Sequence, residues 1–481
     1  MLPLTLLCLL QAILGVLAQQ TPIQLSLNNL YNFTVSTPTS NSRLFNLPLS
    51  RSNDLSVSVA LCANPGTSSP RFFVTNDTSV PDPGPNDLDN PNVFELDVGS
   101  EGFASWTGSM PDGGVLAVSG AGQVPYEVGV SDEGPIHAVW DDYPLLGDST
   151  SNQVLLFSPP FSPFNITQPT YPNYTLPPAE LSFPQGPGSP PNYTLYFTPT
   201  SNPTLASIPR TSCALRALDG PEDFNEGAAE SQGLWLRDTS GWRWQWLVNG
   251  LTPLTNYTVF ALNGSQVSNP VNFITKSAAF SCPIVHSLPY CPSTAYAVPI
   301  AAPQRPATAH DTTTLPSNIS TPLFEVLTNF TTSLLTFPCG RDQYSPLVTC
   351  ADCQEAYRRW LCSIWFPRCS EASPTSTSTE DSTNQQPISA LQAQPTSAPS
   401  RSPGLPPFSA AFDVLLPCVE TCTAVDRACP NALGFKCPVP RFNANSSYGI
   451  GFIDSGQDGV QGKGSTGVAQ DIWGNVWCNL G

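Results

Sequence analysis

The sequence has 481 residues, with 36 acidic side chains against 18 basic ones, which gives a net charge of −18 at neutral pH. Nucleic acid and anionic lipid surfaces repel a chain this acidic, so both are excluded as primary partners. The length is sufficient for about three ordinary domains.

The first eighteen residues have the pattern of a secretory signal peptide. An apolar segment from Leu4 to Leu17 ends at the small residue Ala18, and we predict that residues 1–18 are removed there. Downstream, no apolar stretch reaches the roughly eighteen uninterrupted residues that a membrane helix needs. We therefore expect any membrane association to go through a partner.

Sequons and cysteines also indicate export. The chain holds 15 cysteines, and loss of Cys8 with the signal peptide leaves an even number, which is typical of a disulfide framework in an oxidising compartment. Ten Asn-x-Ser/Thr sequons predict a heavily glycosylated surface. They begin at Asn32, Asn76, Asn165, Asn173, Asn192, Asn256, Asn263, Asn318, Asn329 and Asn445.

Residues 19–148 are predicted to form an all-β domain of the sandwich or jelly-roll type. Short stretches such as 55–59 and 114–118 alternate apolar and small or polar residues, and Pro, Gly, Asn and Asp separate them. From Phe72 to Pro209 there is no Lys or Arg, which favours a solvated acidic face over a cation-attracting surface.

Residues 149–281 are predicted to form a second β domain, a fibronectin III-like sandwich. The stretches 194–197 and 242–246 alternate strongly, and the three tryptophans of the second stretch are expected in the core. Residues 250–261 resemble a tyrosine-corner strand, in which the hydroxyl of Tyr257 hydrogen-bonds to the preceding loop.

Residues 282–481 are predicted to form a disulfide-rich, mainly helical domain. Apolar residues recur at helical spacing over 323–337, with Thr321 as the expected N-cap, over 350–360 and over 418–429. The spacing leaves the pairing of the cysteines open. The predicted framework comprises Cys282, Cys291, Cys339, Cys350, Cys353, Cys362, Cys369, Cys418, Cys422, Cys429, Cys437 and Cys478.

Two segments of this domain have the composition of flexible chain. Residues 370–407 are rich in Ser, Thr, Pro and Gln without cysteine, which predicts a disordered insert that loops out of one domain. Residues 449–467 are Gly-rich and predicted to be flexible, whereas Cys478 indicates that the segment after them is pinned back.

No catalytic pattern is present in the sequence. The three histidines, His137, His286 and His310, form no HExxH motif, and no Gly-x-Ser-x-Gly elbow occurs. Cys350-x-x-Cys353 has the spacing of a redox motif, but the surrounding cysteines favour a structural framework. We expect no enzyme activity, no cofactor and no metal.

The cysteine-rich part resembles a known family. The resemblance rests on Phe337-Pro338-Cys339, Cys350-x-x-Cys353, the run Tyr357-Arg-Arg-Trp-Leu-Cys-Ser-Ile-Trp-Phe-Pro-Arg-Cys369, Pro417-Cys418-x-x-x-Cys422 and Cys429-Pro430. Together these segments resemble the cysteine-rich domain of the stretch-activated calcium-channel component of the fungal high-affinity calcium uptake system. The same domain is similar to the auxiliary factors of the animal sodium leak channel and, more distantly, to the Frizzled-type cysteine-rich fold.

The resemblance, which covers roughly residues 282–437, implies an extracellular auxiliary subunit of a plasma-membrane calcium channel, required for calcium influx. The implied partner is a four-repeat pore subunit, and the implied location is the secretory pathway, including the endoplasmic reticulum, and the outer face of the plasma membrane. Arg341, Arg358, Arg359 and Arg368 are candidate contacts for acidic channel loops, unless they are solvated or support the fold. The alternative function is a secreted or wall-associated binding or structural glycoprotein.

Overall fold

The computed structural model describes most of the chain, in two compact units. The described residues are 22–34, 42–66, 69–120, 124–140, 143–164, 174–183, 185–217, 229–238, 240–339, 344–345, 347–371, 390–439, 443–449 and 478–481. Unit 1 comprises residues 1–139, 203–220 and 264–267, and unit 2 comprises the rest. The predicted signal peptide and almost all of the predicted flexible segment 449–467 lie outside the described residues.

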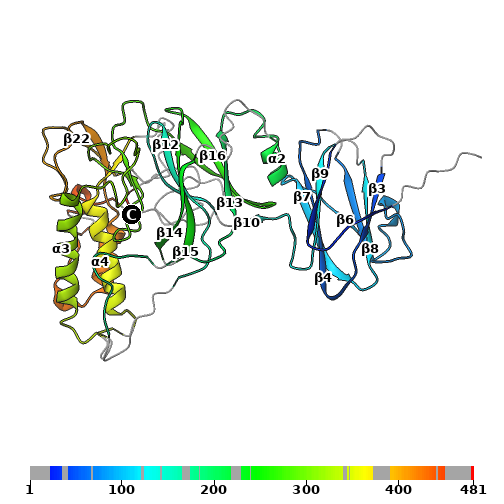
Figure 1. Cartoon of the computed structure of the whole chain (residues 1–481), viewed down its shortest axis with the longest axis horizontal. Coiled ribbons are helices and arrows are strands. Elements are labelled where there is room, and N and C mark those ends of the chain that lie inside the picture. The colour runs from blue at the N-terminus through cyan, green and yellow to red at the C-terminus, as the bar shows by residue number, and fades with distance from the viewer. Residues whose placement is uncertain are drawn as a thin grey trace, which may run out of the picture. The chain divides into compact units, whose positions relative to one another are not determined.

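Unit 1 contains two β-sheets, drawn in blue and cyan in Figure 1. One has the order β1 (Ile23–Gln24), β3 (Ser42–Leu47), β8 (Gly114–Ser119), β5 (Arg71–Thr75), β6 (Val93–Leu96). The other has the order β2 (Asn29–Phe33), β9 (Tyr126–Ser131), β4 (Ser50–Leu61), β7 (Phe103–Met110), and a short 3-10 helix covers Pro85–Asp87. Alternate residues of both sheets, such as Val57 and Phe72, share one buried core.

A disulfide joins a short helix to the end of β4 in unit 1. Cys62, just after β4, bonds to Cys213 in α2 (Ser212–Arg216). Thr211 caps α2 by accepting a hydrogen bond from the backbone N–H of Ala214, while its hydroxyl donates to the carbonyl of Leu61 at 2.6 Å. The long segment between these cysteines therefore returns to the strand that precedes it.

Two further sheets, most of whose strands belong to unit 2, are called here the β part of unit 2. One has the order β11 (Leu145–Ser149), β12 (Gln153–Phe157), β15 (Gly241–Asn249), β14 (Ala229–Asp238). The other has the order β10 (Val139–Trp140), β17 (Gln266–Ser268), β16 (Asn256–Asn263), β13 (Tyr193–Pro199), with β18 (Val271–Ile274) also paired to β16. The boundary predicted between residues 148 and 149 falls inside β11, so the compact units differ from the predicted domains.

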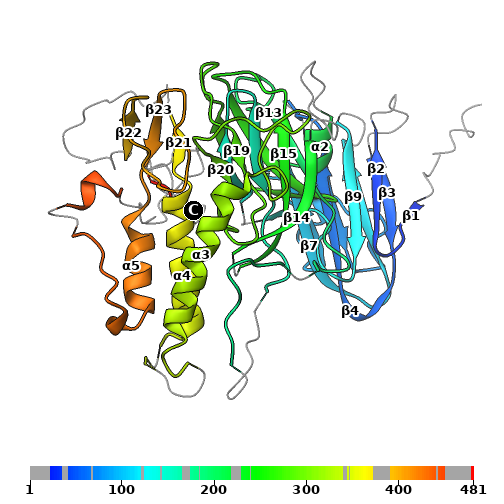
Figure 2. The same cartoon turned by 60° about the vertical axis from the view of Figure 1, so that its left-hand side comes forward.

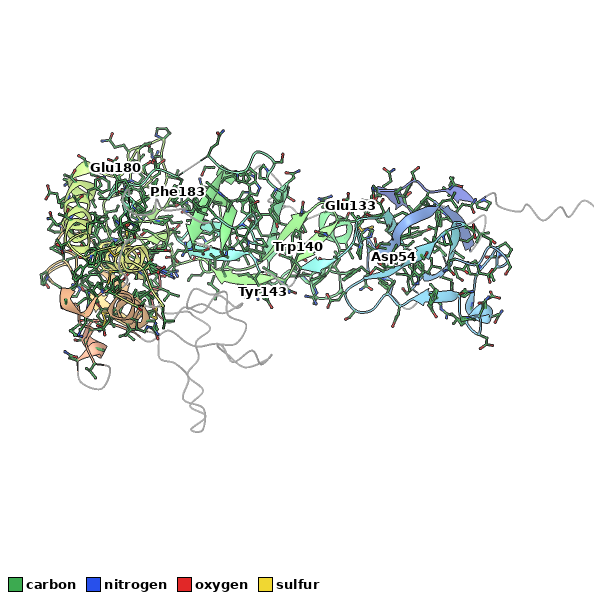
Figure 3. The ribbon with its side chains drawn as sticks, turned by 90° about the horizontal axis from the view of Figure 1, so that it is seen from below. Asp54, Glu133, Trp140, Tyr143, Glu180 and Phe183 are labelled. Atoms are coloured by element: carbon green, nitrogen blue, oxygen red, sulfur yellow. A yellow bond between two sulfur atoms is a disulfide. The ribbon has the colours of Figure 1, made fainter. Side chains whose placement is uncertain are left out.

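Two local predictions for this region are confirmed. The hydroxyl of Tyr257 accepts a hydrogen bond from the backbone N–H of Thr252 at 3.1 Å, which joins the tyrosine to the preceding loop. Trp242 and Trp246 are buried, and Trp244 donates from its indole nitrogen to the carbonyl of Pro191. Phe183, labelled in Figure 3, contacts the ring of Trp242 and lies 4.8 Å from that of Trp235. The tryptophans belong to the core.

The cysteine-rich part of unit 2 combines helices with strands. Its helices are α3 (Ser317–Leu334), α4 (Cys350–Trp365) and α5 (Val419–Ala428), and α4 packs against both of the others (Figure 2). Its strands form a pair, β19 (Ile284–Val285) with β20 (Tyr296–Ala297), and a sheet with the order β21 (Arg368–Ser370), β23 (Phe412–Leu415), β22 (Leu391–Gln394). Two 3-10 turns cover Asn431–Leu433 and Ala444–Ser446.

The predicted mainly helical, Frizzled-like fold for residues 282–481 is wrong. Helices of 18, 16 and 10 residues are a minority of the described part of this region, and over all described residues of the chain β-strand predominates over helix. The segment before α3 is rich in proline, which removes backbone donors and prevents continuous helix, so it runs as extended chain, turns and short strands. Residues 390–407, within the predicted disordered insert, include β22, which pairs with β23.

The start of α3 also differs from the prediction. The helix begins at Ser317, directly after Pro316, so Pro322 lies inside it and Thr321 is not its N-cap. The earlier start adds Ile319 to the buried stripe that continues through Leu323 and Leu327. Burial of one more apolar turn offsets the cost of a proline near the helix N-terminus. Among the described residues, no helix combines the length and apolarity required to cross a membrane.

The N-terminus of α4 has a capping box whose removal should be measurable. Thr349 accepts a hydrogen bond from the N–H of Asp352, and the Asp352 carboxylate accepts one from the N–H of Thr349 at 2.7 Å. We expect T349A to lower the free energy of unfolding by about 1 kcal/mol in guanidinium titrations. T349S keeps the hydroxyl and serves as the control, and equal losses in both variants would contradict the capping role.

Candidate partner-binding region

Disulfides hold the cysteine-rich part together. The structure pairs the twelve cysteines of the predicted framework with one another. The pairs are Cys282–Cys369, Cys291–Cys362, Cys339–Cys350, Cys353–Cys429, Cys418–Cys478 and Cys422–Cys437. Three of these bonds tie α4 to other segments, namely to the loop after α3, to the end of α5 and to the loop after β19. The bonds therefore make α4 the centre of this part of unit 2.

The pairing leaves no free thiol for redox or metal chemistry among the described cysteines. Cys350 and Cys353 bond to different partners rather than to each other, so Cys350-x-x-Cys353 is not a redox pair. In the described part of the chain, two clusters could hold a metal by proximity, Cys62 with Glu127 and Cys213, and Cys418 with Glu420 and Cys478. Both use cysteines that are already joined as disulfides, and a disulfide sulfur is a poor substitute for a thiolate ligand.

An aromatic cluster covers one side of the helices. The rings of Phe330 on α3 and Tyr357 on α4 stack with centroids 3.5 Å apart, and Trp360 lies 4.9 Å from Phe435. The indole nitrogen of Trp360 donates to the hydroxyl of Tyr448 at 2.9 Å. These side chains are all half-buried, so they combine helix packing with a partly exposed apolar surface.

Arg358 supports the fold from inside unit 2. Its guanidinium is 5% exposed and donates to the carbonyls of Ala179 at 2.7 Å, Pro178 at 2.8 Å and Tyr290 at 3.1 Å. Burial lowers the pKa of Arg358 to about 10, against the opposite effect of Glu355, so the group stays charged at neutral pH. In this structure the side chain supports the fold, which is the alternative that the sequence left open for this candidate contact.

Arg368 is also buried and belongs to an ionic cluster. Its Nε lies 3.0 Å from Oδ2 of Asp148, it donates to the carbonyl of Gly147, and its guanidinium lies 5.6 Å from the ring centre of Tyr296. Oδ1 of Asp148 lies 3.9 Å from the amine of Lys276, whose pKa is lowered by burial despite the nearby carboxylates. Arg368 therefore connects β21 to β11 and, like Arg358, takes the fold-supporting role that the sequence left open.

The other two arginines differ from these. Arg359 is exposed on α4, where its Nε donates to the carbonyl of Leu480 at 3.2 Å, and Arg341 lies outside the described residues. A buried arginine that the sequence did not single out, Arg237 in β14, donates to the carbonyl of Gly481 and lies over the ring of Phe157. The only sequence signal for this buried arginine is its place on a strand of alternating pattern, and arginines on such strands are usually exposed.

Unit 1 contains a Ser-His-Glu arrangement that is structural. Nδ1 of His137 lies 2.9 Å from the hydroxyl of Ser58, and its Nε2 lies 3.2 Å from Oε2 of Glu127. Ser58 is completely buried, and its hydroxyl also accepts the backbone N–H of His137 at 3.2 Å. A nucleophile must reach a substrate, so this trio satisfies buried polar groups instead of forming an active site.

Most of the described sequon asparagines are accessible. Exposed examples are Asn32, Asn192, Asn256, Asn318 and Asn329. Asn76 and Asn263 are half-buried, the side chain of Asn445 is not described, and Asn165 and Asn173 lie outside the described residues. Glycosylation at these positions stays a prediction, which access to the amide supports at the exposed ones.

Comparison with known proteins identifies relatives over most of the chain. The profile of the Mid1 family, described as a stretch-activated Ca²⁺-permeable channel component, matches residues 55–462. The chain is 35% identical over 430 residues to the stretch-activated cation channel MID1 of Cryptococcus neoformans var. grubii, with 79% of this chain and 68% of that protein covered. These relatives are named as channels or channel components and not as enzymes.

Two further relatives are more distant. The chain is 26% identical to the stretch-activated cation channel yam8 of Schizosaccharomyces pombe, covering 56% of this chain and 55% of that protein. It is 29% identical to the stretch-activated cation channel MID1 of Saccharomyces cerevisiae, covering 40% of this chain and 34% of that protein. The match thus spans about half or less of these two relatives.

Two solved structures show weak similarity to this chain. The chicken CNTN1 FN1–FN3 domains cover 53% of this chain and 69% of that chain at 11% identity, with a TM-score of 0.15. A two-domain fibronectin type-III segment from chicken tenascin covers 52% of this chain and 98% of that chain at 13% identity, with a TM-score of 0.14. Scores this low carry no argument about the arrangement of the sheets.

Proposed function

Because this chain belongs to the Mid1 family of stretch-activated Ca²⁺-permeable channel components, we propose that it is an extracellular auxiliary subunit of a plasma-membrane calcium channel, required for calcium influx. The family match over residues 55–462 carries this proposal. The pore-forming partner is proposed to be a four-repeat cation channel. The proposed location is the outer face of the plasma membrane, reached through the secretory pathway.

The structure supports this role through its covalent framework. Seven disulfides fit a protein that folds in an oxidising compartment, and six of them stabilise the cysteine-rich part of unit 2. A rigid, crosslinked module can dock on another protein with little loss of conformational entropy. Arg358 and Arg368 are not proposed as channel contacts, because both side chains are buried.

Pull-down from plasma membranes tests the proposal directly. An epitope tag belongs between residues 19 and 22, because Pro22 is exposed whereas Gly481 is buried and accepts a hydrogen bond from Arg237. We expect mass spectrometry of the detergent-solubilised complex to identify a four-repeat cation channel. Calcium uptake should be lost in a fungal strain that lacks this protein and restored by the tagged chain.

A chain without residues 1–18 is the matched control for the compartment. It should accumulate without disulfides inside the cell and fail to restore calcium uptake. Normal uptake in the deletion strain, together with recovery of no channel, would exclude the auxiliary role. It would favour a wall-associated binding glycoprotein instead.

A further inference from the structure

A groove in unit 2 lies beside the sheet of β21, β23 and β22. It has a volume of about 420 Å³ and is lined by residues that precede β19, end β21, and lie on β22 and β23. The half-buried rings of Phe280 and Phe412 form apolar parts of its wall, next to the Cys282–Cys369 disulfide. The groove is therefore built on strands and a disulfide, which hold its shape in the absence of a ligand.

The charged residues of this groove are all acidic. Glu371 and Asp413 line it, and no Lys, Arg or His does among the described residues. Glu371 is oriented by Ser277, whose N–H and hydroxyl donate to its two carboxylate oxygens at 2.8 and 2.7 Å. In the described part of the chain, the carboxylate of Asp413 has no hydrogen-bond or ion-pair partner. An aromatic wall beside carboxylates attracts a cation on a long apolar stem.

We propose that this groove binds a lysine- or arginine-bearing extracellular segment of the channel partner. The inference rests on the proposed function and adds the docking site and its chemistry. Charge complementarity supports a basic segment, since this chain carries a net charge of −18 and the described lining of the groove holds two carboxylates and no cation, although Lys276 lies behind Glu371. Stacking of an arginine or lysine stem on Phe280 or Phe412 would add apolar contact.

Other occupants fit the groove less well. Residues 372–389, which follow Glu371 in the sequence, contain Glu380 and Asp381 but no Lys or Arg, so their charge has the same sign as the groove. Neither of the two possible metal clusters among the described residues includes Glu371 or Asp413. A basic segment of another protein is thus the occupant that the charges favour.

Ala393 allows a test that leaves the native contacts of the groove intact. It is exposed on β22 and pairs with Asp413 in the antiparallel register of β22 and β23. A lysine at 393 would face Asp413 across the two strands and neutralise it, whereas a glutamate would add negative charge at the same place. Both substitutions add a side chain of similar length, so the difference between them isolates charge from steric effects.

We expect A393K to reduce the amount of channel recovered in the pull-down by about tenfold, as loss of one close charge pair would. A393E should recover as much channel as the wild-type chain. E325K, which makes a charge change at an exposed position on α3, is the control for net charge and should also bind normally. Secreted amount and thermal midpoint of the variants establish that folding is unchanged.

The pull-downs with these variants decide whether the groove binds the channel. Loss of the channel with A393K alone supports the proposal. Normal recovery with A393K overturns the groove as a docking site and leaves the auxiliary function standing. Equal loss with A393K and A393E also overturns it, because the effect would be steric. Recovery of no channel by the wild-type chain would refute the proposed function and this inference with it.

Discussion

Replacing Arg368 with methionine is expected to lower the free energy of unfolding of unit 2 by about 3 to 5 kcal/mol. The substitution leaves the Asp148 carboxylate, which is 2% exposed, without its closest cation. Backbone N–H groups of Ser149 and Ala297 still donate to that carboxylate, but the only other cation near it in the described structure is Lys276 at 3.9 Å. A buried charge that loses its partner carries most of its desolvation cost.

The double variant R368M/D148N separates this electrostatic effect from lost packing. An asparagine carries no charge and keeps one oxygen, which can accept from Ser149 or from Ala297, because these two N–H groups donate to different oxygens of Asp148. We expect it to recover more than about 1 kcal/mol relative to R368M alone. Guanidinium titrations followed by tryptophan fluorescence measure both values. A loss below about 1 kcal/mol in R368M would show that the ion pair is dispensable.

Replacing Arg358 with methionine should cost about 3 kcal/mol or more, because the carbonyls of Ala179, Pro178 and Tyr290 lose their donors together. Methionine retains much of the apolar stem, so the loss reports the hydrogen bonds more than a cavity. Reduced secretion of the variant is the expected cellular result. The same titrations measure the change in the free energy of unfolding.

Arg359 is the matched control for Arg358, since it is the next residue of α4 and is exposed. Methionine at 359 should change the free energy of unfolding by less than about 1 kcal/mol, as is usual for surface positions. A normally secreted R359M that fails to bind the channel would identify Arg359 as a contact residue. Equal destabilisation by R358M and R359M would contradict the structural role assigned to Arg358.

The ionic cluster of Arg368 and the hydrogen bonds of Arg358 both stabilise the fold of unit 2. Both join segments of unit 2 that are far apart in sequence: Arg368 joins β21 to β11, and Arg358 joins α4 to the segment between β12 and β13. Loss of calcium uptake in variants at these positions would follow from misfolding and not from a lost channel contact. Binding variants are better placed at exposed groove positions such as Ala393.

Local sequence pattern was sufficient to predict several features of this protein. The apolar stripe through Leu323 and Leu327 predicted α3 because helical periodicity is a property of a few consecutive turns. The Tyr257 hydrogen bond and the buried tryptophans of β15 were predicted for the same reason, since each depends on strand alternation or on a turn a few residues away. The distinctive cysteine spacing also led to the family that the comparison shows.

Long-range contacts, which exist only in the folded chain, determined the rest. Spacing predicted that Cys353 would form a disulfide but could not select Cys429, and the pairing of Arg368 with Asp148 has no local signal at all. The same limit explains the incorrect helical fold, since three correct local helices say nothing about the proline-rich and strand segments between them. Those segments adopt their conformation through contacts with distant residues, and such contacts are not encoded in any short window of sequence.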